Sequence, residues 1–498
     1  MSGSKHTRNT PRRLIKNTVA LSLTQVTRIV VNTALTLLVA RRLGAEGLGK
    51  FAVITAYLQI FQVLSRMGAH RLVVREMARR PDESRSWFHF TVVNQVLGAG
   101  ISTALMMLAV HLLHHPADTT QALKVATLSL FPYAITSASD AAFQAKEQMG
   151  FTALAQITSR GAQMIGSLWA LQAGHDIVAL AWMIVGSQCL MAVIGSGITW
   201  GMGLWVGFRV DLRRAIVLFR QSLDFLIISI SSIVFLRLDT LILSQMVGEK
   251  AVGVYNAAYM VVRVINFLSS SYSEAAYPVM SRLFVQARAR FEMMLGKSLL
   301  LGVTATLLIA LWVGIAAEFI IDLLYPGKDY TTSVSLLRMV SPYLIVFIWN
   351  ALLSKGLMAG NLQRYSLIVT SVKLGVGVIY FSLLTTWLGV KGTALATVLA
   401  ACTGSILNSY FFSRVCALDL MTLVAKPLMV GIITLISLWV ARGVAWPGLI
   451  AGGTLVYLSL LVVFRILSKE DLDLFWQIIR SLKRGSSERL AATSDQEA

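Results

Sequence analysis

The residues best suited to chemistry are ionisable side chains that interrupt long apolar stretches. Five are basic and one is acidic: Arg28, Arg160, Arg237, Arg263, Lys373 and Asp239. A charge buried in lipid costs at least ~2.5 kcal/mol, so we expect these groups to face a wet cavity or a partner. Arg can hold an anion through paired hydrogen bonds. The mainly cationic set therefore predicts a central cavity that binds an anionic group such as a pyrophosphate.

A structural interpretation competes with this one. Asp239 could neutralise Arg237 or Arg263 in an ion pair, and the other cations could extend to the membrane surface. Asp239 is also the carboxylate that we would test first for coupling to H+ or Na+. The other carboxylates in or beside apolar stretches, Asp140, Asp224 and Glu274, are explained equally well by solvation at helix ends.

Three histidines near the end of the third apolar stretch could hold a metal. His111, His114 and His115 have a spacing that would place them on one helical face, but only Asp118 joins them. We interpret them as polar residues at the membrane interface and predict no metal site. The three cysteines have no paired or metal-like spacing.

One glycine-rich segment resembles the start of a phosphate-binding loop. Gly44 to Lys50 fits its opening, but Phe51 stands where that loop needs Ser or Thr, and no strand precedes it. We therefore expect no nucleotide and no other cofactor.

The elements that must position these residues follow from composition. Of 498 residues, 56% are hydrophobic and 14% are charged, whereas a soluble domain has about a quarter charged residues. The apolar blocks have the ~20 residues that a helix needs to cross a bilayer, and backbone groups in lipid must be satisfied within the segment. We predict an all-α integral membrane protein with about 14 transmembrane helices. Their expected ranges are 17–40, 47–67, 87–112, 121–143, 151–173, 177–203, 220–246, 251–272, 298–321, 334–357, 364–386, 391–412, 424–443 and 447–467.

The net charge of +20 is distributed over short loops, which indicates membrane topology rather than nucleic-acid binding. With the N-terminus in the cytoplasm, roughly thirty basic residues face the cytoplasm and about eight face the other side. We predict that both termini are cytoplasmic. The first apolar run lacks a small-residue cleavage pattern, so we interpret it as the first span and not as a signal peptide.

An internal repeat predicts two related halves. The segment from Gly44 to Phe51 aligns without gaps on the segment from Gly248 to Tyr255, and the repeat also relates Arg160 to Lys373. Such duplication is common in transporters. The predicted organisation is a six-helix bundle over 1–210, a second over 211–420, two additional transmembrane helices over 421–467, and an amphipathic helix (469–484) with a disordered tail over 468–498.

Several motifs resemble those of a known family. They are Asn17, Ala40 to Gly49, Arg237 to Thr240, Val252 to Ala258, Leu324 to Gly327, and Leu388 to Thr397. In these motifs, over about residues 14 to 465, the chain resembles the polysaccharide transporter family. That family contains the O-antigen and oligosaccharide flippases of the multidrug/oligosaccharidyl-lipid/polysaccharide exporter superfamily.

The resemblance implies two bundles around a central cavity, alternating access, and a role in surface polysaccharide (O-antigen-like, lipopolysaccharide) biosynthesis. The implied substrate is an oligosaccharide linked to undecaprenyl diphosphate, moved from the cytoplasmic to the outer leaflet of a bacterial or archaeal plasma membrane, here a bacterial inner membrane. Implied partners are membrane lipids, a polysaccharide polymerase or assembly complex, and H+ or Na+.

Three alternatives stay open. A lipid II flippase would also bind a pyrophosphate. A multidrug cation antiporter usually has an acid and a proline bend in its first helix, and the span over 17–40 has neither. An integral-membrane glycosyltransferase or polymerase would need catalytic groups in a sizeable outer loop, and the longest predicted outer loops have about 12 residues.

Overall fold

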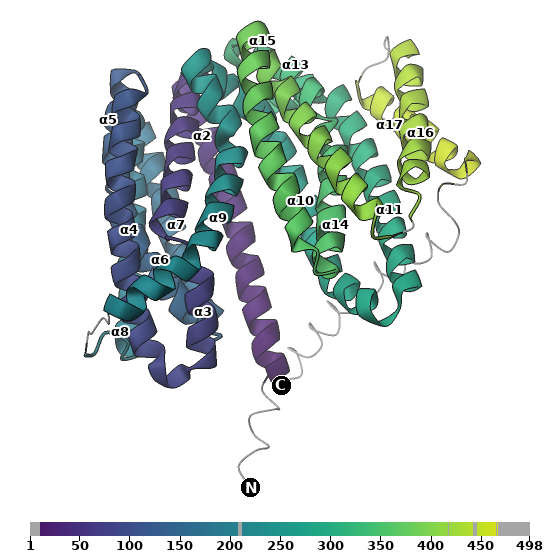
Figure 1. Cartoon of the computed structure of the whole chain (residues 1–498). Coiled ribbons are helices and arrows are strands. Elements are labelled where there is room, and N and C mark those ends of the chain that lie inside the picture. The colour runs from purple at the N-terminus through teal and green to yellow at the C-terminus, as the bar shows by residue number, and fades with distance from the viewer. Residues whose placement is uncertain (1–9, 208–211, 417, 442–445, 465, 467–498) are drawn as a thin grey trace, which may run out of the picture. The chain divides into compact units, whose positions relative to one another are not determined.

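The computed structural model describes residues 10–207, 212–416, 418–441, 446–464 and 466, and every regular element within them is a helix (Figure 1). Apolar side chains and internally satisfied backbone groups explain this uniformity. In chain order the elements are α2 (Thr10–Ser65), α3 (Ala69–Arg79), η1 (Pro81–Glu83), α4 (Ser84–Leu112), α5 (Ala117–Thr127), α6 (Leu130–Ala145), α7 (Met149–Gln172), α8 (Ile177–Gly201), α9 (Leu212–Met246), α10 (Glu249–Gln286), α11 (Arg288–Ile315), α12 (Ala317–Leu324), η2 (Lys328–Tyr330), α13 (Thr331–Val340), α14 (Tyr343–Ala359), α15 (Gln363–Ser413), α16 (Leu420–Val440) and α17 (Trp446–Val463).

The all-α membrane class is confirmed. Among the described residues, nine helices are long and apolar enough to cross a membrane, or ten if the bent pair of α13 and α14 is one span. The predicted number of about 14 stays a prediction. Part of the difference arises because α2 and α15 each contain two of the predicted spans, joined at Gly44 and Gly389, where φ is 68° and 57°. Glycine adopts this left-handed conformation without a Cβ penalty.

The chain forms two compact units. Unit 1 contains 1–264, 319–340 and 367–404, and unit 2 contains 265–318, 341–366 and 405–498. The boundaries fall within α10, α12 and α15 and between α13 and α14, so α10, α12 and α15 each contribute to both units. The two halves that the internal repeat predicts, over 1–210 and 211–420, stay a prediction. The predicted amphipathic helix over 469–484 lies outside the described residues.

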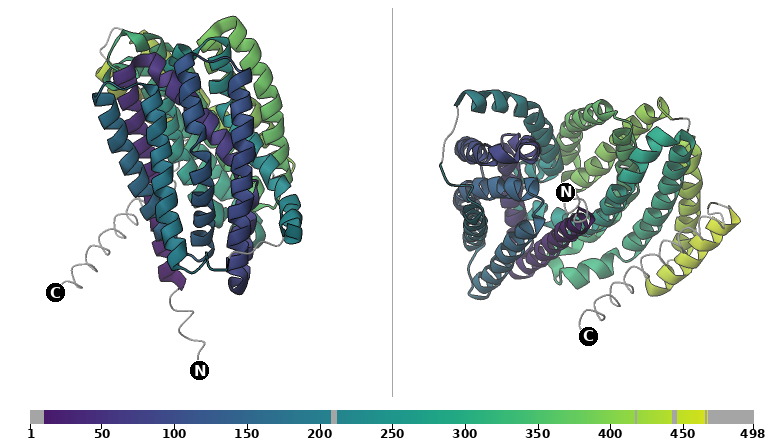
Figure 2. Two further views of the ribbon diagram at one scale, coloured as in Figure 1. Left: turned by 90° about the vertical axis from the view of Figure 1, so that its left-hand side faces the viewer. Right: turned by 90° about the horizontal axis from the view of Figure 1, so that it is seen from below.

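Unit 1 begins with a bundle in which α2 packs along α7, α4 along α6, and α6 and α7 along α8. The purple and blue helices run side by side in both views of Figure 2. Small residues allow this packing. Ala138, Ala141 and Ala142 of α6 are fully buried beside Phe88 of α4 and Val73 of α3. The bundle thereby fixes the positions of the polar side chains that α2 and α7 carry.

The repeat motif marks a close helix crossing within unit 1, which we call the glycine crossing. A Cβ atom added to Gly49 of α2 would lie 1.7 Å from the carbonyl oxygen of Glu249, and one added to Gly253 of α10 would lie 1.7 Å from that of Ala45. The alignment equates Gly49 with Gly253 and Ala45 with Glu249, so the two contacts are reciprocal. Only glycine permits this approach.

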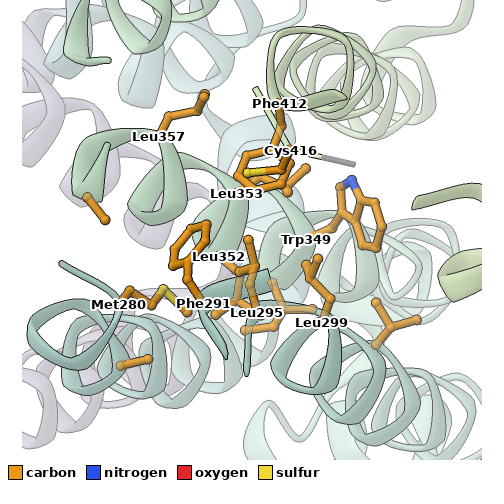
Figure 3. Packing of buried hydrophobic residues seen from close by; sticks show 14 residues of the cluster. Met280, Phe291, Leu295, Leu299, Trp349, Leu352, Leu353, Leu357, Phe412 and Cys416 are labelled. Carbon is orange, nitrogen blue, oxygen red and sulfur yellow. The ribbon is translucent and has the colours of Figure 1, made fainter. Parts of the chain in front are cut away.

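Unit 2 has an apolar core between α11 and α14. Phe291 and Leu295 of α11 pack with Leu352 and Leu353 of α14, and all four are fully buried (Figure 3). Trp349 lies at the edge of this cluster and donates its Nε1 hydrogen to Ser409 Oγ at 2.9 Å. The core therefore satisfies the polar part of its largest side chain within the unit.

Candidate functional site

All six predicted site residues lie in unit 1, on five helices. Arg28 is on α2, Arg160 on α7, Arg237 and Asp239 on α9, Arg263 on α10 and Lys373 on α15. They form two arginine pairs and a separate lysine. Their roles in binding stay a proposal, and their surroundings are described below.

The first pair joins α2 and α7. The guanidinium of Arg160 donates to Oδ1 of Asn32 at 3.2 Å, one helical turn from Arg28. The positive charge of Arg28 opposes that of Arg160. Within the described residues, neither guanidinium has an ion pair with a carboxylate. A like-charged pair whose hydrogen-bond partner is a neutral amide attracts an anion.

The second pair joins α9 and α10. Arg237 donates from Nε and Nη2 to Oε1 of Gln59, at 2.9 Å and 2.5 Å. Its charge is opposed by Arg263 and attracted by Asp239. Arg263 donates to Oδ1 of Asn256 at 3.3 Å and lies 5.4 Å from the centre of the Tyr259 ring. Amide oxygens and an aromatic face therefore position these cations without cancelling their charge.

Asp239 is 8% exposed and is held by its neighbour. Its Oδ1 accepts from the backbone nitrogen of Thr240 at 2.6 Å and from the Thr240 hydroxyl at 3.2 Å. Among the residues that the structure describes, no ion pair joins Asp239 to Arg237 or Arg263, and the structural interpretation of this carboxylate stays a prediction. The carboxylate influences Arg237 through space only.

Lys373 has a different environment from its repeat partner Arg160. Its Nζ lies 4.7 Å from the centre of the Phe235 ring, and its stem packs against Gly404, where an added Cβ would lie 2.5 Å from Lys373 Cδ. The aromatic face stabilises the ammonium without a carboxylate. No described contact joins Lys373 to either arginine pair.

Sequence reasoning missed the amides that hold the arginines, namely Asn32, Gln59 and Asn256. Asn32 follows Arg28 by one turn, and Asn256 precedes Arg263 by two turns, so helical spacing was an available signal for both. Gln59 gave no such signal because its partner is on another helix. The prediction for the histidines was wrong in its geometry. The helix α4 ends at Leu112, so the three do not share a helical face.

Glu274, one of the carboxylates considered for ion coupling, has a local partner in unit 2. Lys355 of α14 donates to its Oε1. This ion pair accounts for the presence of a charged residue in an apolar helix, so no functional role is needed to explain Glu274.

Comparison with known proteins gives a family and a fold. The family model described as "Polysaccharide biosynthesis protein" matches residues 14–284, just over half of the chain. A protein of Yersinia pseudotuberculosis named "Putative O-antigen export protein" is 25% identical over 134 residues. That match spans 27% of this chain and 31% of the relative, so it covers about a third of the relative's length.

Two solved structures have the same fold. The lipid II flippase MurJ in an inward closed conformation has a TM-score of 0.72 at 15% identity, over 91% of this chain and 99% of that one. An inward-facing multidrug resistance transporter of the MATE family has a TM-score of 0.61 at 15% identity, over 80% of this chain and 98% of that one. At this identity the likeness establishes the fold.

Proposed function

Because the chain belongs to the polysaccharide biosynthesis protein family, as its motifs predicted, we propose that it is a flippase for a lipid-linked oligosaccharide and not an enzyme. The proposed substrate is an oligosaccharide on undecaprenyl diphosphate, moved from the cytoplasmic to the outer leaflet of a bacterial inner membrane during surface polysaccharide biosynthesis.

The observation that carries this proposal is the pair of Arg28 and Arg160. The two positive charges repel each other, and Arg160 has the neutral amide of Asn32 as its hydrogen-bond partner. Such a pair is costly until an anion neutralises it. A diphosphate offers several oxygens and negative charge, which suits two guanidinium groups with fixed donor geometry.

The same charge balance disfavours a cation as substrate. An organic cation would meet like charge at both arginine pairs and at Lys373, and Asp239 is the acidic member of the set. A lipid II flippase is the second candidate, because the fold is that of MurJ and lipid II also carries a pyrophosphate. The two candidate functions differ in the sugar that the transported lipid carries.

The proposed mechanism is alternating access with both termini in the cytoplasm. The diphosphate binds the arginines while the lipid tail stays in the bilayer, and the sugar follows through a polar cavity. Binding of H+ or Na+ and contact with a polysaccharide polymerase are further parts of the proposal, and the resemblance to the family supports them.

The test is translocation in inverted membrane vesicles, where the cytoplasmic leaflet faces outward. A labelled lipid-linked oligosaccharide is added, and the fraction that becomes protected from an added glycosidase is measured. We would compare the intact protein with Arg28→Ala, Arg160→Ala and the double variant Arg160→Ala/Lys373→Ala at matched expression. The control is Arg79→Ala, which removes an exposed arginine of α3.

We expect a loss of at least about tenfold for Arg160→Ala, because one charge-assisted interaction contributes about 1.5–3 kcal/mol. Normal transport in the double variant would overturn the cationic site. The same vesicles supplied with lipid II discriminate the two candidates: faster transport of lipid II than of lipid-linked oligosaccharide would support the second.

A further inference from the structure

Gln59 of α2 is a polar residue that follows a buried stretch and lies outside the predicted set of site residues. Tyr57 and Leu58, which precede it, are 2% and 4% exposed, whereas Gln59 is partly exposed. The helices α2 and α9 pack along each other within unit 1. Across this interface the side chain of Gln59 contacts Arg237 of α9.

One amide oxygen fixes the orientation of the Arg237 guanidinium. Nε and Nη2 of Arg237 both donate to Oε1 of Gln59, at 2.9 Å and 2.5 Å. A guanidinium has donors and no acceptor, so the oxygen of the amide is the atom that faces it. Because two donors of one rigid plane meet one acceptor, the amide sets the direction in which the rest of the guanidinium points.

Both side chains keep donors that the protein does not use. Nη1 of Arg237 and Nε2 of Gln59 have no hydrogen-bond partner among the described residues. Both side chains are partly exposed, and neither nitrogen is one of the fully buried atoms without a partner, so both are open to solvent. Each of these nitrogens carries two hydrogens. A charged donor group and a neutral one therefore lie next to each other.

The charges around these donors leave one surplus positive charge. Arg263 opposes the charge of Arg237, and Asp239 attracts it. Oδ1 of Asp239 is bonded to Thr240. The neutral amide of Gln59 adds hydrogen-bond donors to this group without adding repulsion between cations. A carboxylate in its place would pair with Arg237 and cancel the surplus charge.

The internal repeat places Gln59 opposite a cation in the other half. Continued without gaps, the alignment of Gly44 with Gly248 equates Gln59 with Arg263. Arg237 thus interacts with two repeat-related positions, of which one carries an amide and the other a guanidinium. A second guanidinium at position 59 would give three mutually repelling cations. The difference between the repeats therefore limits the positive charge while it keeps the number of donors high.

From this geometry we infer that Gln59 is a binding and specificity-determining residue for the transported lipid. Its Oε1 positions Arg237, and its amide nitrogen donates, together with Nη1 of Arg237, to oxygens of one phosphoryl group. Phosphoryl oxygens accept several hydrogen bonds, which suits a neutral donor beside a charged planar one. The inference rests on the proposed function, because the phosphoryl group is that of the proposed lipid-linked substrate.

The test measures binding of a short diphosphate lipid separately from transport. The full-length protein is purified in detergent and titrated with farnesyl diphosphate by calorimetry, and farnesol is the probe that lacks the diphosphate. Gln59→Glu keeps the length of the side chain and an oxygen for Arg237, but it removes the amide donor and the surplus charge. Gln62→Glu is the matched control, because it adds the same charge to α2 at a residue with no described hydrogen bond to an arginine.

We expect Gln59→Glu to weaken binding of farnesyl diphosphate at least about tenfold, because a hydrogen bond to a charged group contributes about that factor or more. Its thermal unfolding midpoint should equal or exceed that of the parent, since the new carboxylate pairs with Arg237. Gln62→Glu should weaken binding less than about threefold. If Gln59→Glu does not fold, Gln59→Met takes its place and should weaken binding at least about threefold, with an unchanged response to farnesol.

Parent-like binding in Gln59→Glu, or equal weakening in Gln59→Glu and Gln62→Glu, would overturn the inference, because a carboxylate preserves a purely structural contact with Arg237. Failure of the parent to bind farnesyl diphosphate would also overturn it. Translocation by the same variants separates this inference from the proposed function. Normal translocation by Gln59→Glu would overturn the inference alone. A parent that binds the diphosphate through Gln59 and moves no lipid-linked oligosaccharide would overturn the proposed function and leave the diphosphate site standing.

Discussion

Charged residues in the apolar helices of the two units are held in different ways. In unit 2, Glu274 is paired with Lys355, and Arg288 lies 3.5 Å from Glu292. In unit 1, the arginine pairs are held by amides and have no carboxylate partner among the described residues. A charge with a carboxylate partner is satisfied by the fold alone. A repelling pair without one gains free energy when an anion binds, which is why we place substrate recognition in unit 1.

The apolar core of unit 2 should affect stability and leave transport by the folded protein unchanged. Leu353 is fully buried between α11 and α14, so Leu353→Ala leaves a cavity and should cost ~2–5 kcal/mol of unfolding free energy. Thermal unfolding in detergent measures the loss, and transport per folded molecule should match the parent. A selective loss of transport at unchanged stability would break the comparison, because unit 2 would then contribute to recognition.

Reversal of one charge in unit 1 should have the opposite effect to Leu353→Ala: transport should fall and stability should not. Arg160→Glu replaces repulsion with attraction to Arg28, so stability should be equal or higher. Translocation should fall about 100-fold, because an attractive contact of about 1.5–3 kcal/mol becomes a repulsive one. Vesicle transport and thermal unfolding are measured on the same preparation. Equal losses in both would indicate that Arg160 is structural.

Arg160→Lys sharpens the comparison by keeping the charge and removing the planar donor geometry. We expect transport to fall about tenfold at unchanged stability, because Lys cannot form a bidentate contact with a phosphate. The transport rate at several ionic strengths is the measurement. Activity equal to the parent would show that charge suffices and would remove the argument for a bidentate clamp.

The smallest effect is expected in the ion pair of unit 2. Glu274 is 64% exposed, so Lys355→Met should change the unfolding free energy by less than about 1 kcal/mol and transport by less than about twofold. Glu274→Gln is the matched variant from the other side of the pair. A large transport defect in either would revive Glu274 as a coupling residue.

Composition and local pattern determined a large part of this protein. Apolar blocks of about bilayer length predicted helices throughout, because no other structure satisfies backbone groups within a lipid-exposed segment. The repeated motif from Gly44 and from Gly248 predicted related halves, and its glycines lie in reciprocal contact at the glycine crossing. The family resemblance rested on such motifs, and the match over residues 14–284 confirms it.

Side-chain partnership was decided by tertiary structure. Helical spacing places Asn32 beside Arg28, but Arg160 comes from α7 and reaches Asn32 only through packing of α7 on α2. Lys373 is related to Arg160 by the repeat and yet contacts Phe235. His115 differs from its histidine neighbours because α4 ends before it and α10 brings Glu249 to it. Periodicity reports which face of a helix a residue occupies, and only packing between helices determines which side chain that face meets.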